Sequence, residues 1–238
     1  MARAQTILIT GASSGLGLEL THRLCPQGNI IIGVGRNAQT LEDIKEEECY
    51  GFMPVVWDLG QSEMPESLSQ TLKNGPLPEW VILNAGVYRY QDLRNTDEYV
   101  RAVNYTTNVR LMENLSNLGV RSFVLVSSIM AFLPDTKLPA YGKSKADITA
   151  EFKRMKRAGL ISAASFVVFP GPLQQKSGFL KGTFAACAES IIKGMKEKGG
   201  KDIYYPPFWC NALKLVNLFP KGLVRFVFKI LRPHGEKR

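Results

Sequence analysis

The chain has 238 residues, of which 45% are hydrophobic and 21% are charged, and its formal net charge is +9. This ordinary composition excludes a disordered chain, a coiled coil and a collagen-like repeat, and the length allows a full hydrophobic core without disulfides or metal ions. The charge is uneven, because residues 1–120 hold 9 basic and 14 acidic side chains whereas residues 121–238 hold 21 and 7.

Short apolar runs alternate with longer helical patterns along the chain. The runs predict seven strands, at residues 5–10, 30–34, 53–57, 80–83, 122–126, 165–169 and 203–205. The segments between them predict helices at residues 16–25, 41–47, 63–73, 97–118, 141–158 and 184–198. Strands with little polar alternation are buried on both faces, as in a parallel sheet covered by helices. The pattern therefore predicts an α/β, Rossmann-like, doubly wound and mainly parallel seven-stranded sheet with helices on both faces.

A glycine-rich loop follows the first strand and leads into the first helix. Glycines allow a tight turn there and let a pyrophosphate approach the backbone, while the N–H groups at the helix N-terminus face the anion. The residues expected to hold the cofactor phosphates are Gly11, Ser13, Ser14, Gly15, Leu16 and Gly17.

Read together with the loop Thr10–Gly17, motifs further along the chain resemble the short-chain dehydrogenase/reductase family, in its single-domain type with a TGxxxGxG loop. Asn84-Ala85-Gly86 ends the fourth strand like the NAG motif of that family, and Ser128, Tyr141 and Lys145 match its S…YxxxK triad. The resemblance covers about residues 5–205. It implies further cofactor contacts, each near the end of a predicted strand, at Asp58, Leu59, Asn84, Ala85, Gly86, Pro170, Gly171 and Leu173.

The residues after the second strand bear on the choice between NAD and NADP. An acid at this place accepts a hydrogen bond from the ribose 2′-hydroxyl of NAD, but this chain has Gly35 followed by Arg36. A guanidinium attracts a 2′-phosphate and can pair with it through two hydrogen bonds, so Arg36 predicts NADP(H).

Tyr141 and Lys145 are four residues apart at the start of a predicted helix, so both project from one face. A nearby ammonium favours the phenolate, which lets Tyr141 donate a proton to a carbonyl oxygen or accept one from an alcohol. Ser128 would hold the substrate oxygen, whereas the adjacent Ser127 is expected to face the interior or support the site. The resemblance adds a ribose contact by Lys145 and a fourth catalytic residue, Asn104, that would hold a water linked to Lys145.

The substrate pocket of the family is built from the loops after strands four, five and six. In this chain those loops suggest an apolar pocket, with the segment 171–182 as a mobile lid. Because no threonine follows Pro170-Gly171, the cofactor carboxamide is left to Leu173 backbone groups or to Gln174. The apolar side chains of these loops are Val87, Tyr88, Ile129, Phe132, Leu133, Leu173 and Phe179.

The C-terminal extension, residues 206–238, departs from the compact ending of the family and packs as an appendage on the domain formed by residues 1–205. It mixes apolar and basic residues, with Pro220 between two short helices. Such a segment can lie on an anionic membrane, cover the substrate pocket or form a subunit contact. These alternatives stay open, and the resemblance implies a homodimer or homotetramer.

Cysteine spacing and terminal sequence bear on the compartment. The four cysteines form no CxxC pair and read as reduced thiols, and the two histidines cannot build a multi-histidine metal site. No apolar run has the length of a signal-peptide core or a membrane span. We therefore expect a cytoplasmic protein that needs no metal ion, with peripheral contact to a membrane as an open alternative.

The sequence predicts an NADP(H)-dependent oxidoreductase that interconverts a carbonyl and a secondary alcohol on a small, apolar substrate. One alternative is a catalytically silent dinucleotide-binding regulatory protein of the same fold. A sugar-nucleotide epimerase or dehydratase is disfavoured by length, and nucleic-acid binding is not expected because only the basic half supports it.

Overall fold

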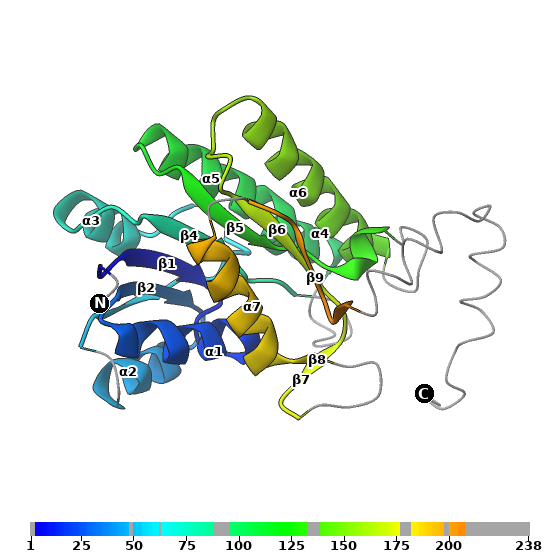
Figure 1. The fold of residues 1–238 in the computed structure, drawn as a ribbon. Helices are drawn as coiled ribbons and strands as arrows, with labels where there is room; N and C mark the ends of the chain where they lie inside the picture. Colours follow the sequence, from blue (N-terminus) through cyan, green and yellow to red (C-terminus); the bar gives the residue numbers. More distant parts are fainter. Residues whose placement is uncertain are drawn as a thin grey trace, which may run out of the picture.

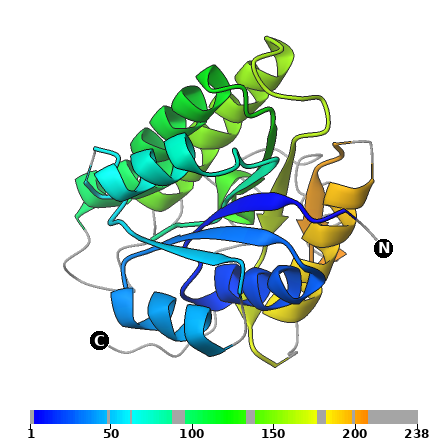
Figure 2. The ribbon, with the colours of Figure 1, turned by 90° about the vertical axis from the view of Figure 1, so that its left-hand side faces the viewer.

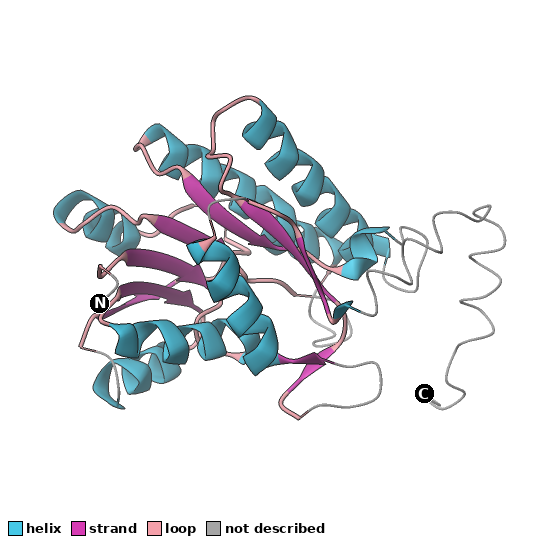
Figure 3. Ribbon diagram, in the orientation of Figure 1, coloured by secondary structure: helices cyan, strands magenta, loops and turns pink. Residues whose placement is uncertain are grey.

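The computed structural model describes residues 3–47, 50–61, 63–87, 96–132, 139–176, 182–197 and 200–207. Its centre is a seven-stranded sheet in the order β3-β2-β1-β4-β5-β6-β9, and every neighbouring pair is parallel (Figure 3). The predicted strands are confirmed to within about one residue at each end. The strands are β1 Thr6–Thr10, β2 Ile30–Gly35, β3 Phe52–Val56, β4 Trp80–Leu83, β5 Ser122–Val126, β6 Phe166–Pro170 and β9 Ile203–Tyr205.

Helices cover both faces of this sheet, which confirms the predicted doubly wound α/β fold (Figures 1 and 2). One face is covered by α1 (Gly15–Leu24), α2 (Ala38–Glu47) and α7 (Phe184–Lys196). The opposite face is covered by α3 (Glu66–Asn74), α4 (Asp97–Arg101), α5 (Thr107–Asn117) and α6 (Pro139–Arg157).

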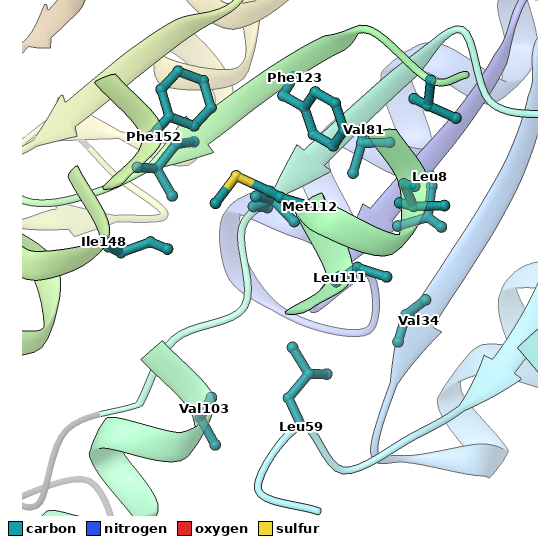
Figure 4. Close-up of a cluster of buried hydrophobic side chains, with 14 of the residues drawn as sticks. Leu8, Val34, Leu59, Val81, Val103, Leu111, Met112, Phe123, Ile148 and Phe152 are labelled. Atoms are coloured by element: carbon teal, nitrogen blue, oxygen red, sulfur yellow. The ribbon is translucent and has the colours of Figure 1, made fainter. Parts of the chain in front are cut away.

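Alternating strand residues divide between two cores, one on each side of the sheet. In β1, Leu8 joins the core under α3–α6, whereas its neighbours Ile7 and Ile9 join the core under α1, α2 and α7. All three are fully buried. Figure 4 shows the first of these cores, where Leu8 and Phe123 from the sheet lie with side chains from the helices. The sheet is thus fixed on both sides, and its carboxyl edge offers rigid positions for a site.

The helix predicted at 97–118 is interrupted. A π-helical turn, η3 (Ala102–Thr106), separates α4 from α5 and contains Asn104. The Asn108 side chain donates to the Val103 carbonyl at 2.7 Å, a bond that lies within this distorted segment. Hydrophobic periodicity did not reveal the interruption, because one widened turn leaves the buried face nearly continuous.

Four short elements lie outside the prediction, because pieces of two to four residues carry no periodicity. They are the 3₁₀ turns η1 (Cys25–Gln27) and η4 (Ile129–Phe132), and the paired strands β7 (Leu173–Gln174) and β8 (Gly182–Thr183). Of the described cysteines, Cys187 is a buried free thiol, whereas Cys25 is disulfide-bonded. The expectation of four reduced cysteines is therefore wrong for Cys25.

Residues 208–238 lie outside the described part of the chain, and the predicted C-terminal extension lies there almost entirely. Among the described helices, none combines the length and the hydropathy that a membrane crossing requires.

Candidate active site

The glycine-rich loop joins the carboxyl end of β1 to α1 at the middle of the sheet. The backbone N–H groups of Gly11 and Ala12 both donate to the Val34 carbonyl, at 2.7 and 3.0 Å, so β2 holds the loop. Gly11 has a positive φ of 72°. A Cβ at Gly17 would overlap the Gly11 carbonyl, so the helix packs against the loop only with glycine at this position.

The N-terminus of α1 is suited to an anion. Among the described residues the Ser14 side chain makes no capping hydrogen bond, and the first turn of α1 carries no acidic residue. Ser14 and Gly15 are exposed. The N–H groups of the first turn lack partners within the helix and carry partial positive charge, so a phosphate fits them.

Space beside this loop explains the residue at the end of β2. A Cβ on Gly35 would lie 2.8 Å from the Ser13 hydroxyl oxygen, which is closer than such contacts normally are. Any side chain at position 35 would therefore require the Ser13 side chain to shift. The first side chain that can reach a ligand there is Arg36, which is exposed.

The loop after β4 is tied to the end of β1. The N–H groups of Asn84 and Ala85 both donate to the Thr10 hydroxyl at 3.0 Å, and the Asn84 side-chain amide donates to the Thr10 carbonyl at 3.0 Å. The Asn84 amide thus supports the glycine-rich loop.

Three of the predicted residues meet next to this loop. A Cβ on Gly86 would lie 3.0 Å from Lys145 Nζ and 3.3 Å from Asn104 Oδ1, so only glycine leaves the lysine its present room. Asn104 accepts from the Val87 N–H at 2.9 Å and donates to the Val87 carbonyl at 2.8 Å and to the Ser144 hydroxyl at 3.2 Å. Its side chain fixes the loop after β4 to η3 and α6.

Lys145 is buried, with 4% of its surface exposed. Its Nζ donates to the Val126 carbonyl at 3.0 Å. Burial penalises the ammonium and lowers the pKa of Lys145 from 10.5 to about 8. A buried amine whose pKa is lowered in this way is typical of a functional site.

The two serines after β5 have different surroundings. The Ser127 hydroxyl lies 2.7 Å from the Thr149 hydroxyl and 3.3 Å from the Lys145 carbonyl, so it supports α6 from the interior, as expected. The Ser128 hydroxyl accepts from the Met130 N–H at 3.2 Å, and its own hydrogen has no acceptor among the described residues.

Tyr141 lies in the first turn of α6, one turn before Lys145, and is half-buried. Its carbonyl accepts from the Ser144 hydroxyl at 2.8 Å. The same helix therefore carries the tyrosine and the lysine, while Ser144 links it to Asn104.

Arg36, which follows β2, and Asp58, which follows β3, line one pocket of about 550 Å³. A residue that the sequence analysis missed connects them: Tyr99 accepts from Arg36 Nη1 at 3.0 Å and donates to Asp58 Oδ1 at 2.8 Å. No motif marks Tyr99, which lies 63 positions from Arg36 in the chain. The pocket is lined by Arg36, Val56, Trp57, Asp58, Gln61, Glu63, Met64, Pro65 and Glu66.

The remaining predicted cofactor residues lie in packed surroundings. Leu59 is 4% exposed and belongs to the core of Figure 4, and its carbonyl accepts from the Thr107 hydroxyl. Pro170 ends β6, and the Gly171 N–H donates to the Tyr205 carbonyl at 2.7 Å. Leu173 packs against the second core from β7. The side chain of Leu59 is therefore placed in the core and not in the pocket.

The loop residues expected to line a substrate pocket are divided. Val87 and Ile129 are buried. Phe132 is 36% exposed. Its ring lies tilted against Phe169 and stacks on Tyr204, with centroid distances of 4.8 and 6.2 Å. Tyr88, Leu133 and Phe179 lie outside the described residues, as do residues 177–181 of the predicted lid. Within the described residues, no three His, Cys, Asp or Glu side chains gather in the manner of a metal site.

Comparisons with known proteins agree on one family. The model of the short chain dehydrogenase family matches residues 5–162. A "Probable NADP-dependent dehydrogenase" of Haemophilus influenzae is 28% identical over 170 residues, which are 66% of each chain. "Carbonyl reductase [NADPH] 2" of Sus scrofa is 29% identical over 157 residues, 62% of this chain and 63% of that one. The matched segments thus span slightly less than two thirds of these relatives.

Solved structures share the fold at low sequence identity. The bulky-bulky ketone specific alcohol dehydrogenase from Comamonas testosteroni superposes with a TM-score of 0.72 at 19% identity, covering 99% of this chain and 98% of that one. A short-chain dehydrogenase from Sphingobium yanoikuyae in complex with NADPH has a TM-score of 0.69 at 18% identity, covering 98% of both chains.

Proposed function

The chain belongs to the short chain dehydrogenase family, and from that premise we propose that it transfers a hydride between NADP(H) and a carbonyl or secondary alcohol. The observation that carries the proposal is the convergence of Lys145 Nζ and Asn104 Oδ1 on the space beside Gly86. These two side-chain atoms lie beside the loop after β4, which Asn84 joins to the glycine-rich loop before α1. A dinucleotide needs such an arrangement, with its phosphates at the helix N-terminus and its reactive ring nearby.

The residues present fit a dinucleotide. The exposed N-terminus of α1 would hold the pyrophosphate, and the Gly17 contact keeps a side chain out of the glycine-rich loop. Arg36 would pair with a 2′-phosphate, and Asp58 would face the adenine. Gly86 and Lys145 would lie at the nicotinamide end. When bound, the nicotinamide supplies or accepts the hydride.

The side chains of this protein manage the proton and the charge. Tyr141 Oη delivers a proton to the carbonyl oxygen during reduction and takes it back during oxidation. The Lys145 ammonium stabilises the phenolate left on Tyr141, and the low-dielectric surroundings strengthen that effect. The Ser128 hydroxyl, with its hydrogen available, donates to the substrate oxygen as negative charge develops there.

Preference for NADP(H) is the finer part of the proposal. It is supported by Arg36 at the pocket, by the glycine, and not an acid, at position 35, and by the names of two relatives that mention NADP or NADPH. A neighbouring fold, 4-hydroxyisoleucine dehydrogenase complexed with NADH, has a TM-score of 0.70 at 18% identity, so the fold itself does not select the cofactor.

We further propose an apolar substrate. Phe132 lies four residues after Ser128 and presents an exposed aromatic edge supported by Phe169. Apolar carbonyl compounds would gain free energy by covering this surface.

The experiment is a turnover assay of the full chain with NADPH and with NADH, followed at 340 nm over ketones, aldehydes, quinones and acyl thioesters of graded apolarity. We expect oxidation of NADPH with kcat/KM at least about tenfold above that of NADH. Binding of NADPH without turnover on any carbonyl would instead indicate a silent dinucleotide-binding protein, and a preference for NADH would overturn the cofactor assignment.

A further inference from the structure

A hydrogen-bonded chain of three side chains crosses the adenosine end of the proposed site. Arg36 follows β2, Asp58 follows β3, and Tyr99 comes from α4; β2 and α4 are labelled in Figure 1. Arg36 Nη1 donates to Tyr99 Oη at 3.0 Å, and Tyr99 Oη donates to Asp58 Oδ1 at 2.8 Å. The phenol therefore lies between the cation and the anion.

Tyr99 is placed by its own helix. Its backbone N–H donates to the hydroxyl of Thr96, the N-cap of α4, at 3.1 Å. This cap fixes the first turn of the helix, from which the Tyr99 side chain extends toward the end of β3.

The loop after β3 leaves room for the ring. A Cβ on Gly60 would overlap the Tyr99 ring, so the ring occupies space that any other residue at position 60 would take. The Gly60 N–H also donates to Asp58 Oδ1 at 2.8 Å, which fixes the carboxylate that Tyr99 contacts.

The protonation state of Tyr99 suits this arrangement. Burial and the hydrogen bond to Asp58 both raise its pKa, against a smaller opposing effect of Arg36. The hydroxyl therefore stays protonated at neutral pH, and it donates to Asp58 while its oxygen accepts from Arg36.

The phenol also keeps the two charges apart. Within the described residues Arg36 and Asp58 form no direct ion pair, so the Asp58 carboxylate does not directly neutralise the guanidinium. An exposed arginine normally loses considerable side-chain entropy when it binds an anion. Held by one N–H, Arg36 keeps its other donors for a phosphate and has less freedom to lose.

We propose that Tyr99 is a positioning residue that sets cofactor specificity, because it holds the Arg36 guanidinium ready for the 2′-phosphate of NADP(H). The inference rests on the proposed function and extends it to α4, an element that no nucleotide motif marks.

The test compares Tyr99→Phe with the parent chain by titration with NADPH and NADH. Loss of the hydroxyl is expected to raise the Kd for NADPH about fivefold and to change the Kd for NADH less than about twofold, with kcat retained. The matched control is Tyr105→Phe, whose ring packs beneath the Arg101 guanidinium at 4.6 Å and whose hydroxyl makes no hydrogen bond among the described residues. It should leave both constants unchanged.

A second variant reaches the same phenol without altering it. Gly60→Ala displaces the Tyr99 ring and should lower the NADPH/NADH preference to a similar extent. In Tyr99→Phe/Gly60→Ala the two effects should not add, because both act by releasing Arg36.

The outcomes separate this inference from the proposed function. If the parent prefers NADPH and Arg36→Ala removes that preference while Tyr99→Phe does not change it, the role of Tyr99 is overturned and the function stands. An equal loss of affinity for both cofactors in Tyr99→Phe also overturns it, since Tyr99 then serves only the shared adenosine. If the parent prefers NADH, the cofactor proposal fails and the inference fails with it.

Discussion

The two ends of the proposed dinucleotide site differ in how they are built. At the end near Gly86, Lys145 and Asn104 are buried, and each makes hydrogen bonds to backbone groups, of Val126 at the end of β5 and of Val87 after β4. At the end near Arg36, an exposed guanidinium is held by a single tyrosine beside an open pocket. Charge acts strongly where water is excluded and weakly where it is present. Chemistry is therefore expected at the buried end and selection at the exposed one.

The largest effect is expected from removing the Tyr141 hydroxyl, at the end of the site where chemistry is expected. Tyr141→Phe should lower kcat by about a thousandfold or more, because proton transfer to the substrate oxygen loses its donor. NADPH affinity should stay within about twofold, and Tyr105→Phe serves as the control. Turnover close to that of the parent would remove Tyr141 from the mechanism.

Lys145→Met should lower the activity and raise the stability of the protein. Activity should fall about a hundredfold or more, because the phenolate loses its neighbouring cation. The folded-state pKa of about 8 lies below the ordinary 10.5, so the unfolded chain binds more protons between these values and the stability of the parent rises with pH across that window. At pH 7 the parent bears the whole cost of a buried ammonium.

Removing that ammonium should raise the free energy of unfolding at pH 7 by up to about 3 kcal/mol. The gain should shrink as the pH approaches 10. Urea titrations of both proteins without cofactor at pH 7 and pH 9.5 measure this, and a variant less stable than the parent at both values would contradict it.

Gly17→Ala tests the contact between α1 and the glycine-rich loop, which lies between the two ends of the site. The added Cβ meets the Gly11 carbonyl, which is backbone and cannot turn aside, so the loop must shift. We expect at least about a hundredfold weaker NADPH binding together with a loss of about 2 kcal/mol in stability. Calorimetric titration checks the binding. Gly28→Ala controls for a loss of stability outside the loop, because its Cβ meets no atom and only its positive φ of 82° strains the alanine.

Arg36→Ala should have a smaller and more selective effect than these three substitutions. The Kd for NADPH should rise about tenfold and the Kd for NADH less than about twofold, with kcat retained. The parent's NADPH preference should also weaken as salt is added, since an exposed charge is screened. Equal changes for both nucleotides would show that this end does not discriminate.

The sequence predicted the sheet well because its strands are short, apolar and separated by clear helical patterns. Of the motif residues, Gly86, Asn104 and Lys145 meet after the end of β4. Their catalytic roles remain predictions.

What the sequence did not reveal depends on contacts between distant residues. Tyr99 reaches Asp58 across 41 positions, and no local pattern encodes that bond. The π-turn around Asn104 adds one residue to a helix whose periodicity hardly changes. The core position of the Leu59 side chain was missed because a motif names a residue without giving the direction of its side chain.

The fully buried Thr10 hydroxyl, which accepts two N–H groups from the segment after β4, has a practical consequence for engineering. Anyone who transplants the nucleotide-binding turn from a relative must carry Thr10 and Asn84 across together. Exchanging Thr10 alone would remove the hydroxyl that accepts from the Asn84 and Ala85 N–H groups, and exchanging Asn84 alone would remove the amide that donates to the Thr10 carbonyl. Each loss should cost about 1 kcal/mol. The two segments thus form a single exchangeable unit, although more than seventy residues separate them in the chain.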